Sequence, residues 1–284
     1  MQLVAYGAQD IYLTGNPQIT FFKVVYRRHT NFSMECIEQT IQGSSKTDGG
    51  TGTVTISRNG DLVYKVYVTS ESVGITNGDE IISEVEVEIG GQQIDRHFKE
   101  WNQVWNELTT VESKAVGLKI MKGCVGSSGN STSPGLIQIP LNFWFCRNPG
   151  LALPLIALQY HEVKLKFNWG VASSSGPVNA VCKVMCDYIY LDTDERRRFA
   201  QVSHEYLIEQ LQKQSAQERT TTKLNFNHPV KEIIWVTPRF ANNEYLTARI
   251  KLNGHDRFSD QQEEYFQLRQ PYDYHTAIPS QNFP

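Results

Sequence analysis

The sequence predicts an all-β protein that holds two copies of one antiparallel sandwich or barrel, and three observations support this prediction. Apolar and polar residues alternate with period two in several stretches of the chain. Glycine and asparagine turn signals separate these stretches. Four local matches, in the same order, relate the part of the chain before residue 100 to the part after residue 194. Strands with one solvent-exposed face and one buried face, joined by such turns, are typical of antiparallel sandwiches and barrels.

The first strands are predicted on either side of Asn59-Gly60. The stretch "TGTVTISRNGDLVYKVYVTS" (51–70) holds two alternating, β-branched runs around this pair. Because both turn residues tolerate positive φ, the pattern predicts a hairpin. Three further stretches alternate in the same way: "EVEVEIGGQQI" (84–94), "HEVKLKFNW" (161–169) and "VCKVMCDYIYLD" (181–192). The first of these three is predicted to turn at Gly90-Gly91.

One helix and one loop interrupt the strands. The stretch "DRHFKEWNQVWNELTTV" (95–111) is the predicted helix, with apolar side chains at nearly helical spacing: Phe98, Trp101, Trp105 and Leu108. The two tryptophans could form an aromatic binding platform, but packing in the core is the preferred interpretation. The stretch "GCVGSSGNSTSPG" (123–135) is a loop by composition. Of the two Asn-x-Ser/Thr sequons, Asn130 in this loop is a better candidate glycosylation site than Asn31.

The internal repeat sets residues 26–41 against 195–212, and two later stretches follow in order. The matched positions are Arg27 with Arg198, Ile37-Glu38-Gln39 with Ile208-Glu209-Gln210, Asn59 with Asn227, Gly91 with Gly254 and Asp95-Arg96 with Asp256-Arg257. The second copy has no counterpart of residues 136–167 or 181–192. We therefore expect the chain to be a shortened form of a longer protein. We also expect it to aggregate when expressed alone, because a sheet cut there leaves open strand edges.

Few residues suggest chemistry. The sequence has no phosphate-binding Gly-Lys-Ser/Thr loop, no GxSxG and no HExxH, and its seven histidines include no HxH pair. A metal-binding enzyme of cupin type is therefore poorly supported, and no enzyme, metal or cofactor is expected. Cys182 and Cys186 share one face of a predicted strand and are interpreted as buried thiols. The glutamates between Glu84 and Glu88 alternate with valine, which favours a solvated strand face over paired acid–base carboxylates.

Two basic clusters, Arg27-Arg28-His29 and Arg196-Arg197-Arg198, occupy equivalent places in the two copies. One interpretation is contact with phosphates of a nucleic acid. The preferred one is a positioning role, in which arginines pair with carbonyls or with acidic neighbours such as Glu195. The net charge of −3 also provides no general attraction for a polyanion, so no direct contact with nucleic acid is expected.

Long stretches of the chain resemble one known family. They are "LVAYGAQDIYLTGNPQITFFKVVYRRHTNF", "ISRNGDL", "VEIGGQQID", "NPGLALPLIALQYHEVKLKF", "YIYLDTDERRRFAQVSHEYLIEQLQ" and "KLNFNHPVKEIIW". In order and over nearly the whole chain, these stretches resemble the major capsid proteins of nucleocytoplasmic large DNA viruses, in particular those of algal and amoebal giant viruses.

The resemblance implies a tandem double jelly roll, which is two antiparallel sandwiches in series, with the second incomplete in this chain. Residues 1–25 would be an N-terminal arm at the base of the assembly, and residues 26–194 the first jelly roll. Residues 195–284 would be the N-terminal part of the second jelly roll. Asn16 and Pro17 would form a turn between the arm and the first jelly roll. The arginine clusters, represented by Arg27 and Arg28 and by Arg197 and Arg198, would mark the entrances to the two copies.

The resemblance also implies a structural function in the virion. Three copies would form a homotrimer, and its six jelly rolls would make a pseudo-hexagonal capsomer of an icosahedral shell. The expected partners are further copies, neighbouring capsomers and minor capsid proteins at the base. The internal membrane of the virion would lie nearby without being spanned, and assembly would take place in the host cytoplasm. The alternative function is that of a glycan-binding jelly-roll surface protein that acts at the host surface, although the sequence offers no clustered Asp/Asn sugar motif.

Overall fold

The computed structural model of the protein describes residues 30–71, 78–123, 136–170, 180–215, 221–236 and 247–279. These residues belong to two compact units. The larger unit, called the sandwich unit below, holds the described residues before Gln212 except Asn106–Ser113. The second unit holds Asn106–Ser113 and the chain from Gln212 onwards.

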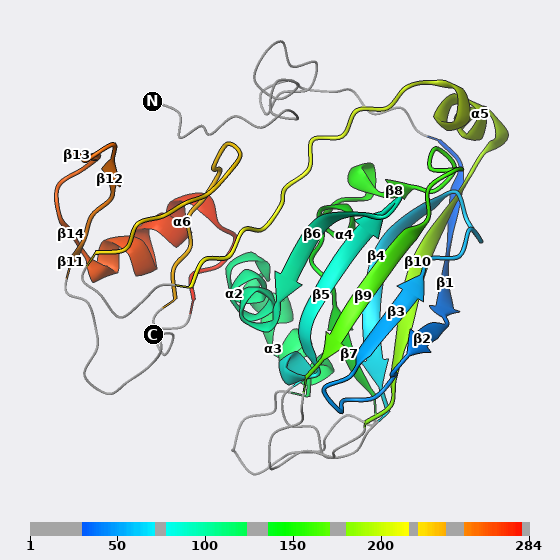
Figure 1. Ribbon diagram of the computed structural model, residues 1–284, viewed down its shortest axis with the longest axis horizontal. Helices are drawn as coiled ribbons and strands as arrows, with labels where there is room; N and C mark the ends of the chain where they lie inside the picture. Colours follow the sequence, from blue (N-terminus) through cyan, green and yellow to red (C-terminus); the bar gives the residue numbers. More distant parts are fainter. Residues whose placement is uncertain are drawn as a thin grey trace. The chain divides into compact units, whose positions relative to one another are not determined.

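The sandwich unit consists of two antiparallel sheets of five strands each (Figure 1). Sheet I contains, in spatial order, β1 (Phe32–Gln39), β10 (Cys182–Leu191), β4 (Leu62–Ser70) and β7 (Ile137–Pro140), and β8 (Leu153–Pro154) also pairs with β4. Sheet II contains β2 (Ile41–Gly43), β3 (Thr51–Thr55), β9 (Val163–Trp169), β5 (Ile82–Ile89) and β6 (Gln92–Phe98). Because the chain passes repeatedly from one sheet to the other, the arrangement is a jelly roll. The all-β jelly-roll class expected from the sequence is confirmed.

The core lies between the two sheets and follows the predicted alternation. In β9, Val163, Leu165 and Phe167 are buried, whereas Lys164 and Lys166 point away from the core. Such alternation arises because successive side chains of a strand lie on opposite faces. The strands predicted over 84–94, 161–169 and 181–192 are all present.

The hairpin predicted at Asn59-Gly60 is wrong. β3 pairs with β2 and β9 in sheet II, whereas β4 pairs with β10, β7 and β8 in sheet I. Asn59-Gly60 therefore lies on a crossing between the two sheets. Gly60 is needed there for close approach, because a Cβ at this position would lie 2.8 Å from the Cβ of Tyr188. The β5–β6 connection, in contrast, is a tight turn in which Gly90 and Gly91 have φ of 60° and 84°.

Short helices lie in the connections between strands. They are the α-helices α2 (Lys99–Thr109), α3 (Glu112–Met121), α4 (Trp144–Arg147) and α5 (Thr193–Gln201), and the 3₁₀-helices η1 (Gly78–Glu80) and η2 (Pro149–Leu151). The helix predicted from residue 95 begins only at Lys99, because Asp95 and His97 still alternate with Arg96 in the hairpin strand β6. Trp101 and Trp105 are half-buried on α2 and stack on each other, with ring centroids 5.1 Å apart.

The second unit has short strands and little burial. Its elements are β11 (Thr247–Ala248), β12 (Lys251–Leu252), β13 (His255–Asp256), β14 (Gln261–Gln262), the π-helix η3 (Tyr265–Arg269) and α6 (Gln270–Tyr274). Among its described residues from Gln212 onwards, only Pro271 is buried. The β12–β13 turn has Asn253 and Gly254 at φ of 52° and 82°. In the part of the chain that the structure describes, no helix has the length and apolar character that a membrane span requires.

Candidate functional site

The segment that follows β10, residues 192–211, is the candidate functional site, and it is called the linker below. It leaves sheet I through α5, continues without regular structure from Ser203, and reaches β6 and α4 (Figure 1). Two anchors hold it to the sandwich unit. One lies at α5, and the other, called the clamp, is made by Ile208–Leu211.

The anchor at α5 uses the second arginine cluster. Arg196 forms an ion pair with the buried Asp61, with Nη2 and Oδ2 2.9 Å apart, and Asp61 also accepts a hydrogen bond from the backbone of Leu191. Arg198 pairs with Glu195 one turn away at 3.2 Å. Arg197 is exposed. The two ion pairs support the positioning interpretation over phosphate binding.

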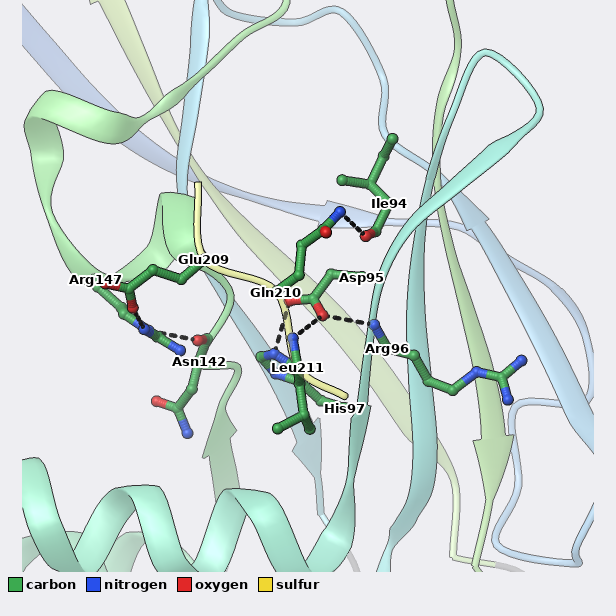
Figure 2. Close-up of polar contacts among 9 residues, drawn as sticks. All are labelled: Ile94, Asp95, Arg96, His97, Asn142, Arg147, Glu209, Gln210 and Leu211. Atoms are coloured by element: carbon green, nitrogen blue, oxygen red, sulfur yellow. Dashed lines mark hydrogen bonds and ion pairs between the residues drawn. The ribbon is translucent and has the colours of Figure 1, made fainter. Parts of the chain in front are cut away.

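The clamp is built on Asp95 of β6, whose side chain is buried (Figure 2). Its Oδ1 accepts hydrogen bonds from the backbone N–H of Leu211 at 2.9 Å and of Arg96 at 2.8 Å. Its Oδ2 lies 2.9 Å from Nε2 of His97, a ring that is only 1% exposed. This ring stacks on Phe143 at 4.2 Å between centroids. The carboxylate therefore joins the linker backbone to the interior of the jelly roll.

Arg147 of α4 forms the other side of the clamp (Figure 2). It makes an ion pair with Glu209, and its Nε donates to the backbone oxygen of Asn142 at 2.9 Å. Its guanidinium also lies over the ring of Trp105, 4.2 Å from the centroid. Burial lowers the pKa of Arg147, and the nearby Glu209 opposes this shift. Since an arginine starts from a very high pKa, the side chain stays charged at neutral pH.

Four consecutive linker residues therefore each meet a different partner. Ile208 packs against the main core, Glu209 pairs with Arg147, and Leu211 bonds to Asp95. Between them, the side-chain amide of Gln210 donates to the backbone oxygen of Ile94 at 2.7 Å. A shift of one residue along the chain would separate all four from their partners. The clamp thus fixes the register of the linker on β6, which is an edge strand of sheet II.

The sequence pointed to some of the clamp residues but not to their contacts with one another. Asp95, Glu209 and Gln210 appeared as repeat matches, and Arg147 carried no signal at all. The predicted turn and entrance residues Asn16, Pro17, Arg27 and Arg28, and the candidate glycosylation site Asn130, lie outside the described residues.

The described residues contain no group of three or more His, Cys, Asp or Glu side chains placed to hold a metal ion. Burial raises the pKa of the thiols of Cys146 and Cys182 to about 12, so both stay protonated and unreactive at neutral pH. The carboxylates Glu84 and Glu86 both pair with Arg96, and Glu88 pairs with Lys166. These cross-strand ion pairs agree with a structural strand face.

Comparisons with known proteins give one consistent result. A family model for the major capsid protein N-terminus matches residues 20–194, and a model for the large eukaryotic DNA virus major capsid protein matches residues 195–247. The major capsid protein of Pyramimonas orientalis virus is 54% identical, over 99% of this chain and 76% of its own length. That of Phaeocystis pouchetii virus is 45% identical, over 89% of this chain and 61% of its own length.

A solved structure gives the same result at the level of the fold. A chain of the PBCV-1 virus capsid, a quasi-atomic model, superimposes with a TM-score of 0.69 and 34% sequence identity. The match covers 89% of this chain and 76% of that chain.

Proposed function

Because this chain belongs to the family of major capsid proteins of large eukaryotic DNA viruses, and so is a structural component of the capsid, we propose that three copies form one capsomer. The matches to the capsid family and to a solved capsid structure carry this proposal, and the clamp is compatible with it. A shell built from one repeated unit requires that the second half of every chain start at the same place on the first half. The contacts of Ile208–Leu211 with the sandwich unit satisfy this requirement.

We also propose the division of the chain that the resemblance implied, with residues 1–25 as the arm, 26–194 as the first jelly roll and 195–284 as part of the second. The further partners in this proposal are neighbouring capsomers and minor capsid proteins at the base. The membrane inside the virion lies nearby, and assembly takes place in the host cytoplasm. Contact with nucleic acid is not part of the proposal, and the pairing of Arg196 and Arg198 with carboxylates supports its omission. Catalysis is not part of it either, and the reported relatives give the glycan-binding alternative no support.

Sedimentation velocity tests the proposed trimer. Two proteins are compared: this chain, and a chimera that joins to it the parts of the Pyramimonas orientalis virus protein that lie outside the match. We expect the chimera to sediment as a discrete species of three chains, because its jelly rolls then have the strands of the longer relative. A chimera that stays monomeric at the highest attainable concentration would contradict the proposal.

A further inference from the structure

A lysine and an aspartate form an ion pair in the interior of the sandwich unit. Nζ of Lys122, the residue after α3, lies 2.5 Å from Oδ2 of Asp79 in η1. The two side chains are only 8% and 5% exposed. Lysines are rarely buried this deeply, and a buried ion pair is costly because both charges lose their hydration. Elsewhere in the sandwich unit, lysines that pair with carboxylates remain in solvent, since the side chains of Lys164, Lys166 and Lys183 are 35% to 45% exposed.

The backbone holds these two residues close to each other. The N–H of Gly78 donates to the carbonyl oxygen of Lys122 at 2.7 Å. Glycine is needed for this approach, because a Cβ at position 78 would lie 2.4 Å from the same oxygen. It would also lie 3.2 Å from Cγ2 of Ile137, a fully buried core residue. η1 is thus packed against both Lys122 and the apolar core, which limits how far the lysine and Asp79 can separate.

The pair places a nucleophile beside a carboxyl carbon. Cγ of Asp79 is one bond beyond Oδ2, so Nζ of Lys122 lies close to the roughly 3–3.5 Å separation of a near-attack geometry. A lysine amine is a nucleophile once it has lost its extra proton. In an apolar surrounding, transfer of a proton from an ammonium to a carboxylate is easier than in water, because the neutral pair avoids the cost of two buried charges. Exclusion of water also disfavours hydrolysis of an amide formed there.

We propose that Lys122 and Asp79 form an intramolecular isopeptide bond. The ammonium first gives one proton to the carboxylate, and the amine nitrogen then attacks Cγ. An N–C bond forms, and a C–O bond breaks as one carboxyl oxygen leaves as water. Of the three ammonium protons, one stays on the amide nitrogen and two leave with the water, so the step needs no oxidant, reductant or further reagent.

The bond closes a covalent loop from residue 79 to residue 122. This loop contains β5, β6 and α2, and with β6 it contains Asp95 of the clamp. A covalent cross-link stabilises a fold mainly because it restricts the unfolded chain. The bond therefore strengthens the part of the jelly roll that holds the linker. This inference does not depend on how many copies of the chain assemble.

Denaturing mass spectrometry of the soluble chain, and of the soluble chimera described above, tests the bond. We expect each protein to be lighter than its sequence by the mass of one water. Trypsin does not cut after an acylated lysine, so digestion should yield a branched peptide that joins Asp79 to Lys122. Lys122→Arg keeps the positive charge, but a guanidinium stays protonated and does not attack, so this variant should have its full sequence mass. Asp79→Ala should also have its full sequence mass.

The matched control is Lys166→Arg, which changes a solvent-exposed lysine that pairs with Glu88. We expect this variant to lose one water as the parent does. An ordinary ion pair between Lys122 and Asp79 would affect the melting temperature of their variants without changing any mass, so the mass distinguishes the two cases. A parent chain at its full sequence mass would overturn the inference, and so would a loss of water that persists in Lys122→Arg.

Discussion

The sandwich unit and the second unit both contain stretches that the predicted internal repeat matches, but among the described residues only the sandwich unit has an apolar core. Both contain the same type of tight turn, with Gly90-Gly91 in one and Asn253-Gly254 in the other at similar positive φ values. The strands that flank the first turn have eight and seven residues, whereas those that flank the second have two each. Turn chemistry therefore operates locally in both copies. Long strands and burial require the opposite sheet as well.

Some backbone N–H and C=O groups of the second unit form hydrogen bonds with side-chain amides rather than with another strand. The amide of Gln212 both donates to the backbone oxygen of Asn227 and accepts from its N–H, at 2.9 Å each. Gln214 makes the same type of contact with Lys223 and Asn225. In the sandwich unit, strand ladders such as β2–β3 supply these bonds. Backbone groups of the second unit therefore form hydrogen bonds even though few apolar side chains are buried there. Because apolar burial is the main source of folding stability, we expect the second unit to be the less stable of the two.

The largest expected difference lies in hydrogen exchange. We expect amides in β4, β5, β9 and β10 to exchange only when the sandwich unit opens, whereas those in β11–β14 lie in a unit whose described residues include almost no buried side chains. We expect exchange to be at least about 10³-fold slower in the former group. Exchange mass spectrometry of the full chain measures this ratio. Similar protection in the two groups would show that the second unit is as stable as the first.

Thiol chemistry should report on the sandwich unit alone, because all five cysteines precede Gln212. Burial raises the pKa of Cys146 and of Cys182 from 9.0 to about 12. The folded state therefore holds these protons more tightly than the unfolded chain. The resulting stabilisation is fully present below pH 9 and is lost as the pH rises towards 12.

We expect alkylation of Cys146 and Cys182 at pH 8 to be roughly 10³-fold slower than in the unfolded chain, with a melting temperature that falls from pH 9 upwards. Iodoacetamide labelling with peptide mapping and melting curves against pH check both outcomes. A change confined to the second unit, such as Phe266→Ala, should leave the labelling rate unchanged. Rapid alkylation of either buried thiol in the folded chain would show that reagents reach the core of the sandwich unit.

A matched pair of phenylalanines tests packing directly. Phe167 is fully buried in β9 and stacks on Trp169, whereas Phe266 is half-buried beside Trp235 in the second unit. Phe167→Ala should lower the stability of the sandwich unit by about 3–5 kcal/mol, since it leaves a cavity in a closed core. Phe266→Ala should leave the main melting transition within about 2 °C, because that transition belongs to the sandwich unit. Equal effects in calorimetry would mean that the two units unfold as one.

A matched pair of aspartates tests the clamp, and its effect should be smaller. Asp95→Asn removes a buried charge that accepts two backbone hydrogen bonds, and should cost about 1–3 kcal/mol and speed exchange of the Leu211 amide. Its repeat counterpart Asp256 is exposed and pairs with Arg249 at 3.6 Å and with Lys251 at 3.7 Å. Asp256→Asn should therefore cost under about 0.5 kcal/mol. Denaturant unfolding of the two variants measures both losses. If Asp95→Asn cost as little as Asp256→Asn, the contacts of Asp95 in the clamp would not stabilise the sandwich unit.

Much of the fold could be predicted because alternation is a local signal, as β5 and β9 show. The hairpin at Asn59-Gly60 was wrong because the same turn residues suit a hairpin and a crossing between sheets. The start of α2 was misplaced because residues 95–98 satisfy both periodicities over so short a length. The clamp could not be predicted, since Asp95, Arg147 and Glu209 meet only after both sheets have formed. Asp95 and Glu209 were nevertheless among the positions matched by the predicted repeat.

The crossing at Gly60 restricts which residue this position can hold in the family. Tyr188 is fully buried, and its hydroxyl donates to the backbone oxygen of Ser57 at 2.7 Å, so the ring has no room to move away from residue 60. A Cβ at position 60 would lie 2.8 Å from the Cβ of Tyr188, an atom that every residue except glycine carries, so a smaller side chain at 188 would not make room for it. Among relatives, a lineage that keeps this crossing should therefore keep glycine at position 60, whichever side chain stands at 188.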